Sequence, residues 1–259
     1  MIALRSLAKN YMRYVGIDVR KSRYHFVDPF EDQARAISTL TKEPMVFDIG
    51  GHFGETIEAY RRVLPASTVH SFEPFPESFA TLSQRFGGAP KVSLHQSAVS
   101  EATGQSVLFV NSNSLMNSLR AMLPDDATFG SDGRNVGELA VPTTTLDDFC
   151  SANSISAIDI LKIDVEGGEL RVLAGAAGLL ERQAVRIVFA EVAFSPRYEQ
   201  QTSFEDLFRF LTAKGFRLYG FYDVARELNG TLGWLNAVFI SSEVYTSLPK
   251  NFWQRASSR

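Results

Sequence analysis

The sequence predicts an α/β fold in which a mostly parallel sheet is covered by helices on both faces. Three observations support this prediction. From Glu43 onward, apolar segments of strand length alternate with segments of helix length, the first strand runs directly into a glycine-rich turn, and later strands end at acidic residues. Alternation of this kind builds βαβ units, which place successive strands parallel in one sheet.

The first half of the chain supplies three of these strands and two of the helices. Pro65 ends the first helix and Gly87-Gly88 ends the second, because neither residue type continues a helix well. The expected strands are residues 45–49, 67–72 and 91–99, and the expected helices are residues 55–64 and 76–86.

The middle of the chain interrupts this regular pattern. Between two expected strands, residues 106–110 and 139–145, lies a segment that is rich in Asn, Ser, Asp and Gly, residues 111–137. A connection of this length in a compact domain is usually functional. We therefore expect residues 111–137 to form a functional loop or a lid.

Regular alternation then resumes and continues almost to the end of the chain. Because no linker or repeat divides the pattern, we expect one domain, residues 43–245. A basic, partly helical extension, residues 1–42, precedes this domain, and a tail, residues 246–259, follows it. The expected helices are residues 146–151, 168–180 and 204–214, and the expected strands are residues 158–163, 185–192, 216–222 and 235–241.

Composition and charge exclude several classes of protein. The 259 residues carry a formal net charge of −3, so there is no overall basic field and we expect no nucleic-acid partner. The single cysteine, Cys150, excludes an intramolecular disulfide and indicates a small buried residue. No apolar run is long enough to span a bilayer and the start of the chain lacks a secretory pattern, so we expect a cytoplasmic protein.

Residues 1–24 form a basic segment in which Lys and Arg alternate with apolar side chains. One interpretation is a helix that packs over the domain and keeps its basic face in water. The other is a basic amphipathic helix that lies on an anionic membrane surface, which would place the protein at the inner face of the membrane.

The glycine-rich turn after the first strand indicates what the protein binds. A dinucleotide site would have the pattern G-x-G-x-x-G with pyrophosphate at the helix start. Here His52 stands where the second glycine would be, and the Asp48 carboxylate would repel an anion. We therefore expect a ligand with a cationic or hydroxyl group. The turn and helix start comprise Asp48, Gly50, Gly51, His52, Gly54, Glu55 and Thr56.

A second acid, Glu73, follows the strand at residues 67–72, and Pro74 stops that strand. An acid about 20 residues beyond such a turn commonly accepts hydrogen bonds from the ribose hydroxyls of a nucleoside. Because NAD also contains ribose, Glu73 supports a cofactor that contains a nucleoside but does not show which one.

A third block, residues 161–169, has the sequence LKIDVEGGE, a buried strand that ends in a cluster of acids. Together with TLDDF at residues 145–149, VLAGA at residues 172–176 and Ser97-Ala98-Val99 before Gly104, it resembles the FkbM family of methyltransferases. The resemblance covers roughly residues 44–240 in the same order.

This resemblance implies a Rossmann-like class I methyltransferase fold, with a mostly parallel seven-stranded sheet whose last strand is antiparallel. It implies transfer of a methyl group from S-adenosylmethionine, usually to an oxygen of a sugar or natural product. The turn with Asp48 would then hold the methionine part, Glu73 and Pro74 the ribose end, and Ser97-Ala98 the adenine. Two residues depart from the commonest family pattern: His52 replaces an asparagine and Asn236 replaces an acid.

A hydroxyl acceptor is a poor nucleophile and gains from a general base. Asp164 is the first candidate for contacting the methyl donor or acting as base, and Glu191 is the second. Glu166 either orients Asp164 or caps the following helix, and His52 either lines the cofactor turn or serves as a base. Lys162 is expected to pair with an acid. An alternative assigns Asp164, Glu166 and Glu191 to Mg²⁺, which prefers oxygen ligands.

The leading functional hypothesis is an O-methyltransferase that acts on a glycan or a glycosylated small molecule. Two alternatives belong to other classes. A nicotinamide-dependent oxidoreductase is disfavoured by the interrupted G-x-G-x-x-G pattern, and a non-catalytic cofactor-binding module is disfavoured by the acids at every strand end. The sequence names neither the acceptor nor the oligomeric state. Aromatic residues that would stack on a sugar, or pack in the core, are Phe194, Tyr198, Phe221 and Tyr222.

Overall fold

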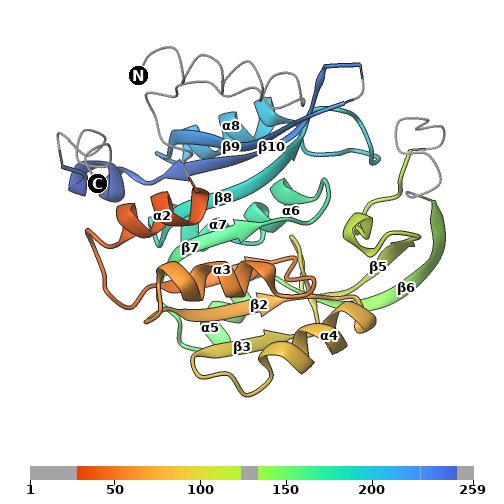
Figure 1. The fold of residues 1–259 in the computed structure, drawn as a ribbon, viewed down its shortest axis with the longest axis horizontal. Helices are drawn as coiled ribbons and strands as arrows, with labels where there is room; N and C mark the ends of the chain where they lie inside the picture. Colours follow the sequence, from red (N-terminus) through yellow and green to blue (C-terminus); the bar gives the residue numbers. More distant parts are fainter. Residues whose placement is uncertain (1–27, 124–133, 228, 250–259) are drawn as a thin grey trace, which may run out of the picture. The chain divides into compact units, whose positions relative to one another are not determined.

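A seven-stranded sheet forms the centre of the fold in the computed structural model, which describes residues 28–123, 134–227 and 229–249 (Figure 1). The strand order is β3-β2-β1-β7-β8-β10-β9. The bounds are Met45–Ile49 for β1, Thr68–Phe72 for β2, Val92–His95 for β3, Ile158–Ile163 for β7, Val185–Ala193 for β8, Arg217–Arg226 for β9 and Leu232–Ile240 for β10.

The direction of the strands confirms the predicted fold class. The pairs β1–β2, β2–β3, β1–β7 and β7–β8 are parallel. The last strand of the chain, β10, runs antiparallel to both β8 and β9. A short connection can join antiparallel strands, whereas each parallel pair needs a longer crossover, usually a helix.

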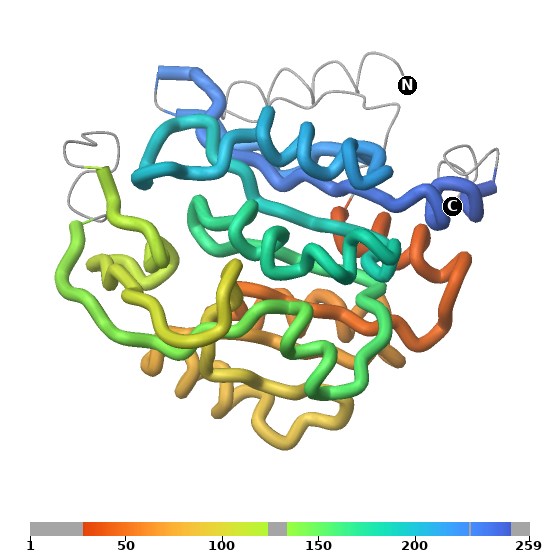
Figure 2. Tube along the Cα trace, turned by 180° about the vertical axis from the view of Figure 1, so that it is seen from behind, coloured from red at the N-terminus to blue at the C-terminus, as the bar shows by residue number. Residues whose placement is uncertain are grey.

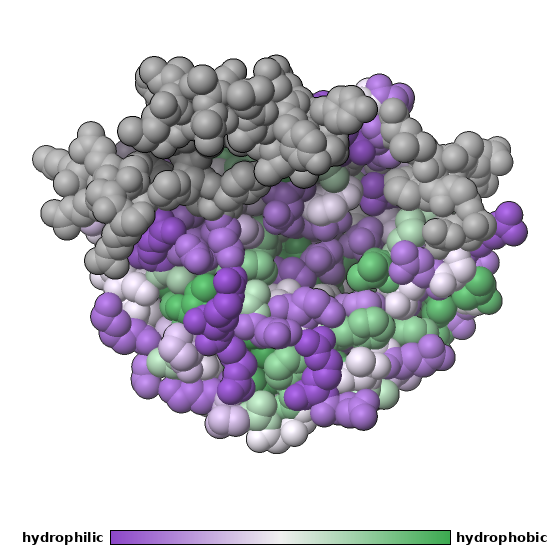
Figure 3. All heavy atoms as spheres, viewed as in Figure 1, coloured by the Kyte–Doolittle hydropathy of each residue, from purple (hydrophilic) through white to green (hydrophobic). Residues whose placement is uncertain are grey.

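Helices cover both faces of the sheet, as predicted (Figures 1 and 2). On one face lie α2 (Pro29–Ile37), α3 (Glu55–Val63) and α4 (Pro76–Phe86). On the other lie α5 (Leu146–Ala152), α6 (Glu169–Ala174), α7 (Ala177–Glu181) and α8 (Phe204–Ala213). A short α9 (Ser242–Ser247) follows β10. Hydrophilic residues cover much of the described surface on the α3 and α4 side (Figure 3).

The main apolar core lies between the sheet and the helices α5 to α8. It contains alternate residues of the central strands together with the inward side chains of these helices, such as Leu146, Leu173 and Leu207. Cys150 of α5 is fully buried in this core, which confirms its predicted role as a small apolar side chain.

The expected strand at residues 91–99 is wrong as a single element. β3 ends at His95, and after a bend the chain forms β4 (Ala98–Val99), which pairs with a different sheet. That second sheet has three strands in the order β4-β6-β5, where β5 is Gly104–Asn111 and β6 is Asn135–Thr144. The apolar pattern continues through both strands, so periodicity alone does not reveal the change of sheet.

The expected helix at residues 168–180 is also divided, into α6 and α7. The division falls at Gly175, where a Cβ atom would overlap the carbonyl oxygen of Ser100. Ser100, which directly follows β4, therefore packs against the end of α6. The helix thus ends at a glycine, which disfavours its continuation, and the close approach of Ser100 leaves no room for a side chain there.

Two expectations fall partly or wholly on residues that the structure does not describe. The basic segment at residues 1–24 lies outside the described residues, as do residues 124–133 of the expected loop. Among the described residues, none of the helices is long and apolar enough to cross a membrane.

Two histidines lie side by side at one end of the sheet. Nδ1 of His70 on β2 is 3.1 Å from Nε2 of His95 on β3, and the two rings are stacked at an interplanar angle of 5°. The ring of Phe149 from α5 makes T-shaped contacts with both histidine rings. Burial lowers the pKa of both histidines, that of His95 to about 4, and the neighbouring His70 contributes to the second shift.

This pair predicts a loss of stability in mild acid. An unfolded histidine has a pKa near 6.5 and folded His95 one of about 4, so the unfolded chain binds more protons between these values. The contribution of neutral His95 to the free energy of unfolding is therefore fully present above pH 6.5 and is lost as the pH falls toward 4. Urea unfolding between about pH 7 and pH 5 should show a shallower pH dependence for His95→Gln than for the wild type. Equal slopes would contradict the prediction.

Candidate active site

The site lies at the edge of the sheet where the carboxyl ends of the parallel strands meet, which is where open α/β sheets bind ligands. A cavity of about 400 Å³ opens there. It is lined by the ends of β1, β2, β7 and β8, by β4, and by the segment 113–119 between β5 and β6. The site residues predicted from sequence that line it are Gly50, His52, Glu73, Pro74, Ala98, Asp164, Glu166 and Glu191.

The glycine turn is held tightly between the ends of two strands. The backbone N–H groups of Gly50 and Gly51 both donate to the carbonyl oxygen of Phe72, at 3.0 and 2.9 Å. Gly50 has φ of 88°, and a Cβ atom there would overlap the carbonyl oxygen of Asp164. Only glycine tolerates this combination of positive φ and close backbone contact.

Asp48 lies beneath this turn and is not among the residues that line the cavity. Its side chain is fully buried and accepts a hydrogen bond from Oγ of Ser71 on β2 at 2.8 Å. Its other carboxylate oxygen is 3.4 Å from Nζ of Lys162, its direct neighbour on β7. Burial raises the pKa of Asp48, and the Lys162 ammonium and the Ser71 hydroxyl offset part of this rise.

Lys162 connects the parts of the site, which confirms the prediction that it pairs with an acid. Its Nζ lies 3.1 Å from Oδ2 of Asp164 and 3.4 Å from the carbonyl oxygen of Gly50, in addition to its contact with Asp48. Burial alone would lower the pKa of Lys162, but the Asp164 and Asp48 carboxylates raise it above its usual value. The ammonium group therefore stays charged within the sheet.

Glu73 is hydrogen-bonded to the glycine turn at His52. Oε2 of Glu73 accepts the backbone N–H of His52 at 2.8 Å, and Oε1 accepts that of Phe75 at 2.8 Å. Burial raises the pKa of Glu73 and lowers that of His52. Nε2 of His52 is 2.9 Å from Oγ of Ser114, so this side chain joins the turn to the segment 113–119.

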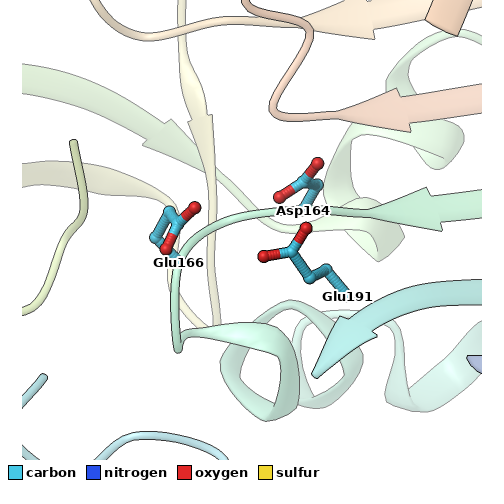
Figure 4. Close-up of side chains that lie close together, drawn as sticks. All are labelled: Asp164, Glu166 and Glu191. Carbon is cyan, nitrogen blue, oxygen red and sulfur yellow. The ribbon is translucent and has the colours of Figure 1, made fainter. Parts of the chain in front are cut away.

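Three carboxylates gather at the ends of β7 and β8 (Figure 4). Asp164, Glu166 and Glu191 each place an oxygen within 4.8 Å of the others. Burial raises the pKa of Glu166 to about 8 and that of Glu191 well above its usual value, and repulsion from Asp164 adds to both shifts. Both shifts favour the protonated forms of Glu166 and Glu191.

Tyr198 holds the carboxyl group of Glu166 in place. Oη of Tyr198 lies 3.0 Å from Oε2 of Glu166 and 3.1 Å from the carbonyl oxygen of Met116. The Tyr198 hydroxyl faces both oxygens as a donor, and its hydrogen bond to Glu166 offsets part of the rise in the pKa of that carboxyl group. The carboxyl group of Glu166 thus faces Tyr198 instead of capping α6, and Glu169 accepts the backbone N–H of Gly167.

The segment 113–119 is the described part of the expected functional loop that lines the cavity. Oγ of Ser118 donates to the carbonyl oxygen of Glu166 at 2.7 Å, and the backbone of Ser118 pairs with Phe109 on β5. The loop is thereby attached to the acid cluster on one side and to the small sheet on the other.

Several predicted residues lie away from the cavity surface. Glu55 is exposed and pairs with Arg85 at 3.4 Å. Other predicted residues that do not line the cavity are Gly51, Gly54, Thr56 and Ser97. Sequence reasoning did not identify Arg171, Arg197 and Trp234, which do line it. They belong to no local motif, and only the three-dimensional arrangement brings them to the cavity.

The residues present fit S-adenosylmethionine. Near the turn the cavity has an apolar surface formed by Ile49, Phe72, Ala98 and Val99, suited to an adenine ring, and the Glu73 carboxylate suited to ribose hydroxyls. The pinned glycine turn leaves its backbone open to a close ligand. The fold and this site define a class I S-adenosylmethionine-dependent methyltransferase.

The chain belongs to the FkbM family of methyltransferases, because the methyltransferase FkbM domain matches residues 48–218. It is therefore a methyltransferase and not a nicotinamide-dependent oxidoreductase. It is similar to 2-O-methyltransferase NoeI of Sinorhizobium fredii, with 28% identity over 174 residues, 64% of this chain and 70% of that protein.

A second relative is the 31-O-demethyl-FK506 methyltransferase FkbM of Streptomyces tacrolimicus, with 32% identity over 174 residues. This match covers 57% of this chain and 65% of the relative, a little less than two thirds of its length. A solved structure of methyltransferase FkbM from Methylobacillus flagellatus is 16% identical with a TM-score of 0.48, covering 77% of this chain and 44% of the other.

The buried position of Lys162 predicts a large effect of its removal. Lys162→Met would leave Asp48 and Asp164 without their cation, and breaking a buried pair from one side costs about 3–5 kcal/mol. The free energy of unfolding, measured with urea, should fall by about this amount. The double variant Lys162→Met with Asp48→Asn also removes the buried negative charge. It should recover most of the lost free energy of unfolding. An unchanged stability of the single variant would contradict the prediction.

Proposed function

We propose that this methyltransferase methylates a hydroxyl group of a sugar or of a glycosylated or other natural-product acceptor. The observation that carries the proposal is the carboxylate cluster at the cavity, next to the cofactor turn. The names of the two relatives describe methylation at oxygen, one at a 2-O position and one at a 31-O position. Oxygen acceptors need a proton acceptor nearby, and the cluster supplies one.

The cofactor, when bound, supplies an activated methyl group. Glu73 would hold its ribose hydroxyls, and the turn at residues 50–54 would hold the amino-acid part. We assign Asp48 a supporting role, because it lies under the turn and bonds to Ser71 and Lys162. These contacts fix the turn before the ligand arrives, which lowers the cost of binding.

Within the cluster, we propose Asp164 as the general base. The Lys162 ammonium at 3.1 Å compensates its negative charge, whereas no hydrogen bond from a cation is seen at Glu191 among the described residues. Asp164 then accepts the proton of the acceptor hydroxyl. Glu166, held by the hydrogen bond from Tyr198, orients the acceptor side, and Glu191 is the second candidate for the base.

The test of this function separates binding from turnover. A panel of sugars, glycosides and macrocyclic alcohols is incubated with the enzyme and methyl-labelled S-adenosylmethionine, and labelled products are identified by mass spectrometry. We expect Asp164→Asn to reduce turnover about 10²–10⁴-fold, the usual contribution of a general base. Its affinity for S-adenosylhomocysteine, measured by calorimetry, should stay close to the wild-type value.

Glu73→Ala is the matched variant with the opposite signature. It should abolish binding of S-adenosylhomocysteine, because it removes the acceptor of the ribose hydrogen bonds. Full turnover of Asp164→Asn would remove Asp164 as the base. A product that carries the label on nitrogen would contradict O-methylation.

The magnesium alternative leads to a separate prediction. Asp164, Glu166 and Glu191 offer three carboxylate oxygens of the kind that Mg²⁺ prefers. In a metal-assisted reaction, treatment with EDTA should abolish activity and added Mg²⁺ should restore it. We expect activity to be unchanged, because Lys162 already compensates charge at Asp164 and Tyr198 bonds Glu166. Loss of activity with recovery on Mg²⁺ would establish the metal.

A further inference from the structure

Trp234 on β10 reaches the cavity from the side opposite the cofactor turn. Trp234 pairs with Ala193 of β8, and Asn236 pairs with Glu191. Alternate residues of a strand point to the same face, so Trp234 and Glu191 lie diagonally on one face of the sheet. Both line the cavity.

The segments on either side of Trp234 are joined by hydrogen bonds and an ion pair. The carbonyl oxygen of Gly233 accepts the backbone N–H of Phe194 at 2.8 Å. Arg197, which also lines the cavity, lies 3.6 Å from Oε1 of Glu227, and that oxygen accepts Oγ of Ser195 at 3.0 Å. These contacts hold the backbone beside Trp234 and the guanidinium group of Arg197, and both residues line the cavity.

This end of the cavity differs in chemistry from the cofactor end. A broad aromatic side chain stands beside a carboxylate, Glu191, and a buried guanidinium, Arg197. An indole offers a flat apolar face, and the two charged groups accept and donate hydrogen bonds. This combination fits a ring that has one face of C–H groups and a rim of hydroxyls.

The size of the cavity limits what enters. Its volume of about 400 Å³ is near the low end of the range for ligand pockets, about 300–1,000 Å³, and the cofactor occupies part of it. The space left beside the cofactor is therefore small. A macrocyclic acceptor would have to stay largely outside.

We propose that Trp234 is the platform on which a pyranose ring of the acceptor lies, with Glu191 and Arg197 hydrogen-bonded to its hydroxyls. This inference rests on the proposed O-methylation and narrows the acceptor to a pyranoside. Trp234 is then a specificity-determining residue that contacts the acceptor and leaves cofactor binding unaffected.

The first test uses the fluorescence of Trp234 in the full chain. The chain has two tryptophans, so Trp253→Phe leaves Trp234 as the only indole. This variant, with and without S-adenosylhomocysteine, is titrated with methyl pyranosides of the gluco, galacto, fuco and rhamno series. We expect at least one pyranoside to shift the emission, and the matching open-chain alditols, which lack a ring face, to leave it unchanged.

The second test separates acceptor binding from folding and from the cofactor. With the pyranoside that is methylated, Trp234→Ala should raise KM about tenfold or more, with a smaller change in kcat and unchanged affinity for S-adenosylhomocysteine. Trp234→Phe should recover part of the loss. Phe221→Ala is the control, because Phe221 is an exposed aromatic residue of the neighbouring strand that does not line the cavity.

Each contrary result has a distinct meaning. Methylation of a pyranoside with the same KM in Trp234→Ala overturns the role of Trp234 and leaves O-methylation standing. The pyranoside inference is overturned if no pyranoside shifts the emission and the enzyme methylates only acceptors that lack a sugar ring. Absence of methyl transfer to any hydroxyl, with a pyranoside that still shifts the emission, overturns the proposed reaction and leaves the platform standing.

Discussion

The site depends on a buried row of polar side chains that crosses three neighbouring strands of the seven-stranded sheet. Ser71, Asp48 and Lys162 are neighbours in the register of β2, β1 and β7, and Lys162 reaches on to Asp164. An ammonium group inside a sheet is stable only when carboxylates compensate it. Because Lys162 also contacts the carbonyl oxygen of Gly50, the cofactor turn and the proposed base share one electrostatic support.

Helices and strands whose bounds are set by local residues have the bounds predicted from the sequence. Those whose bounds involve distant contacts do not. The helix at Pro76–Phe86 has the predicted bounds because a proline starts it and glycines end it, and β7 has them because its apolar run is short and bounded. The departure of β4 from the main sheet depends on pairing with β6, and the break between α6 and α7 lies where Ser100 meets Gly175. Neither partner is close in sequence.

The same distinction holds in the site. Glu73, Asp164, Glu166 and Glu191 could be expected together because parallel strands end at one edge of a sheet. The burial of Asp48 could not, since it depends on a cross-strand lysine that faces the same side. The orientation of Glu166 depends on a hydrogen bond from Tyr198, which also bonds to Met116, and both residues come from distant segments.

The small sheet and its loop have a consequence for how such enzymes diversify. The segment 113–119 supplies much of the cavity wall but contributes no strand to the seven-stranded sheet, and its anchor points are Ser114 on His52 and Ser118 on Glu166. Insertions between β5 and β6 therefore change the shape of the wall without altering the register of the sheet. Changes in this segment would reshape one wall of the cavity while the strands that carry the glycine turn and the carboxylates stay in place.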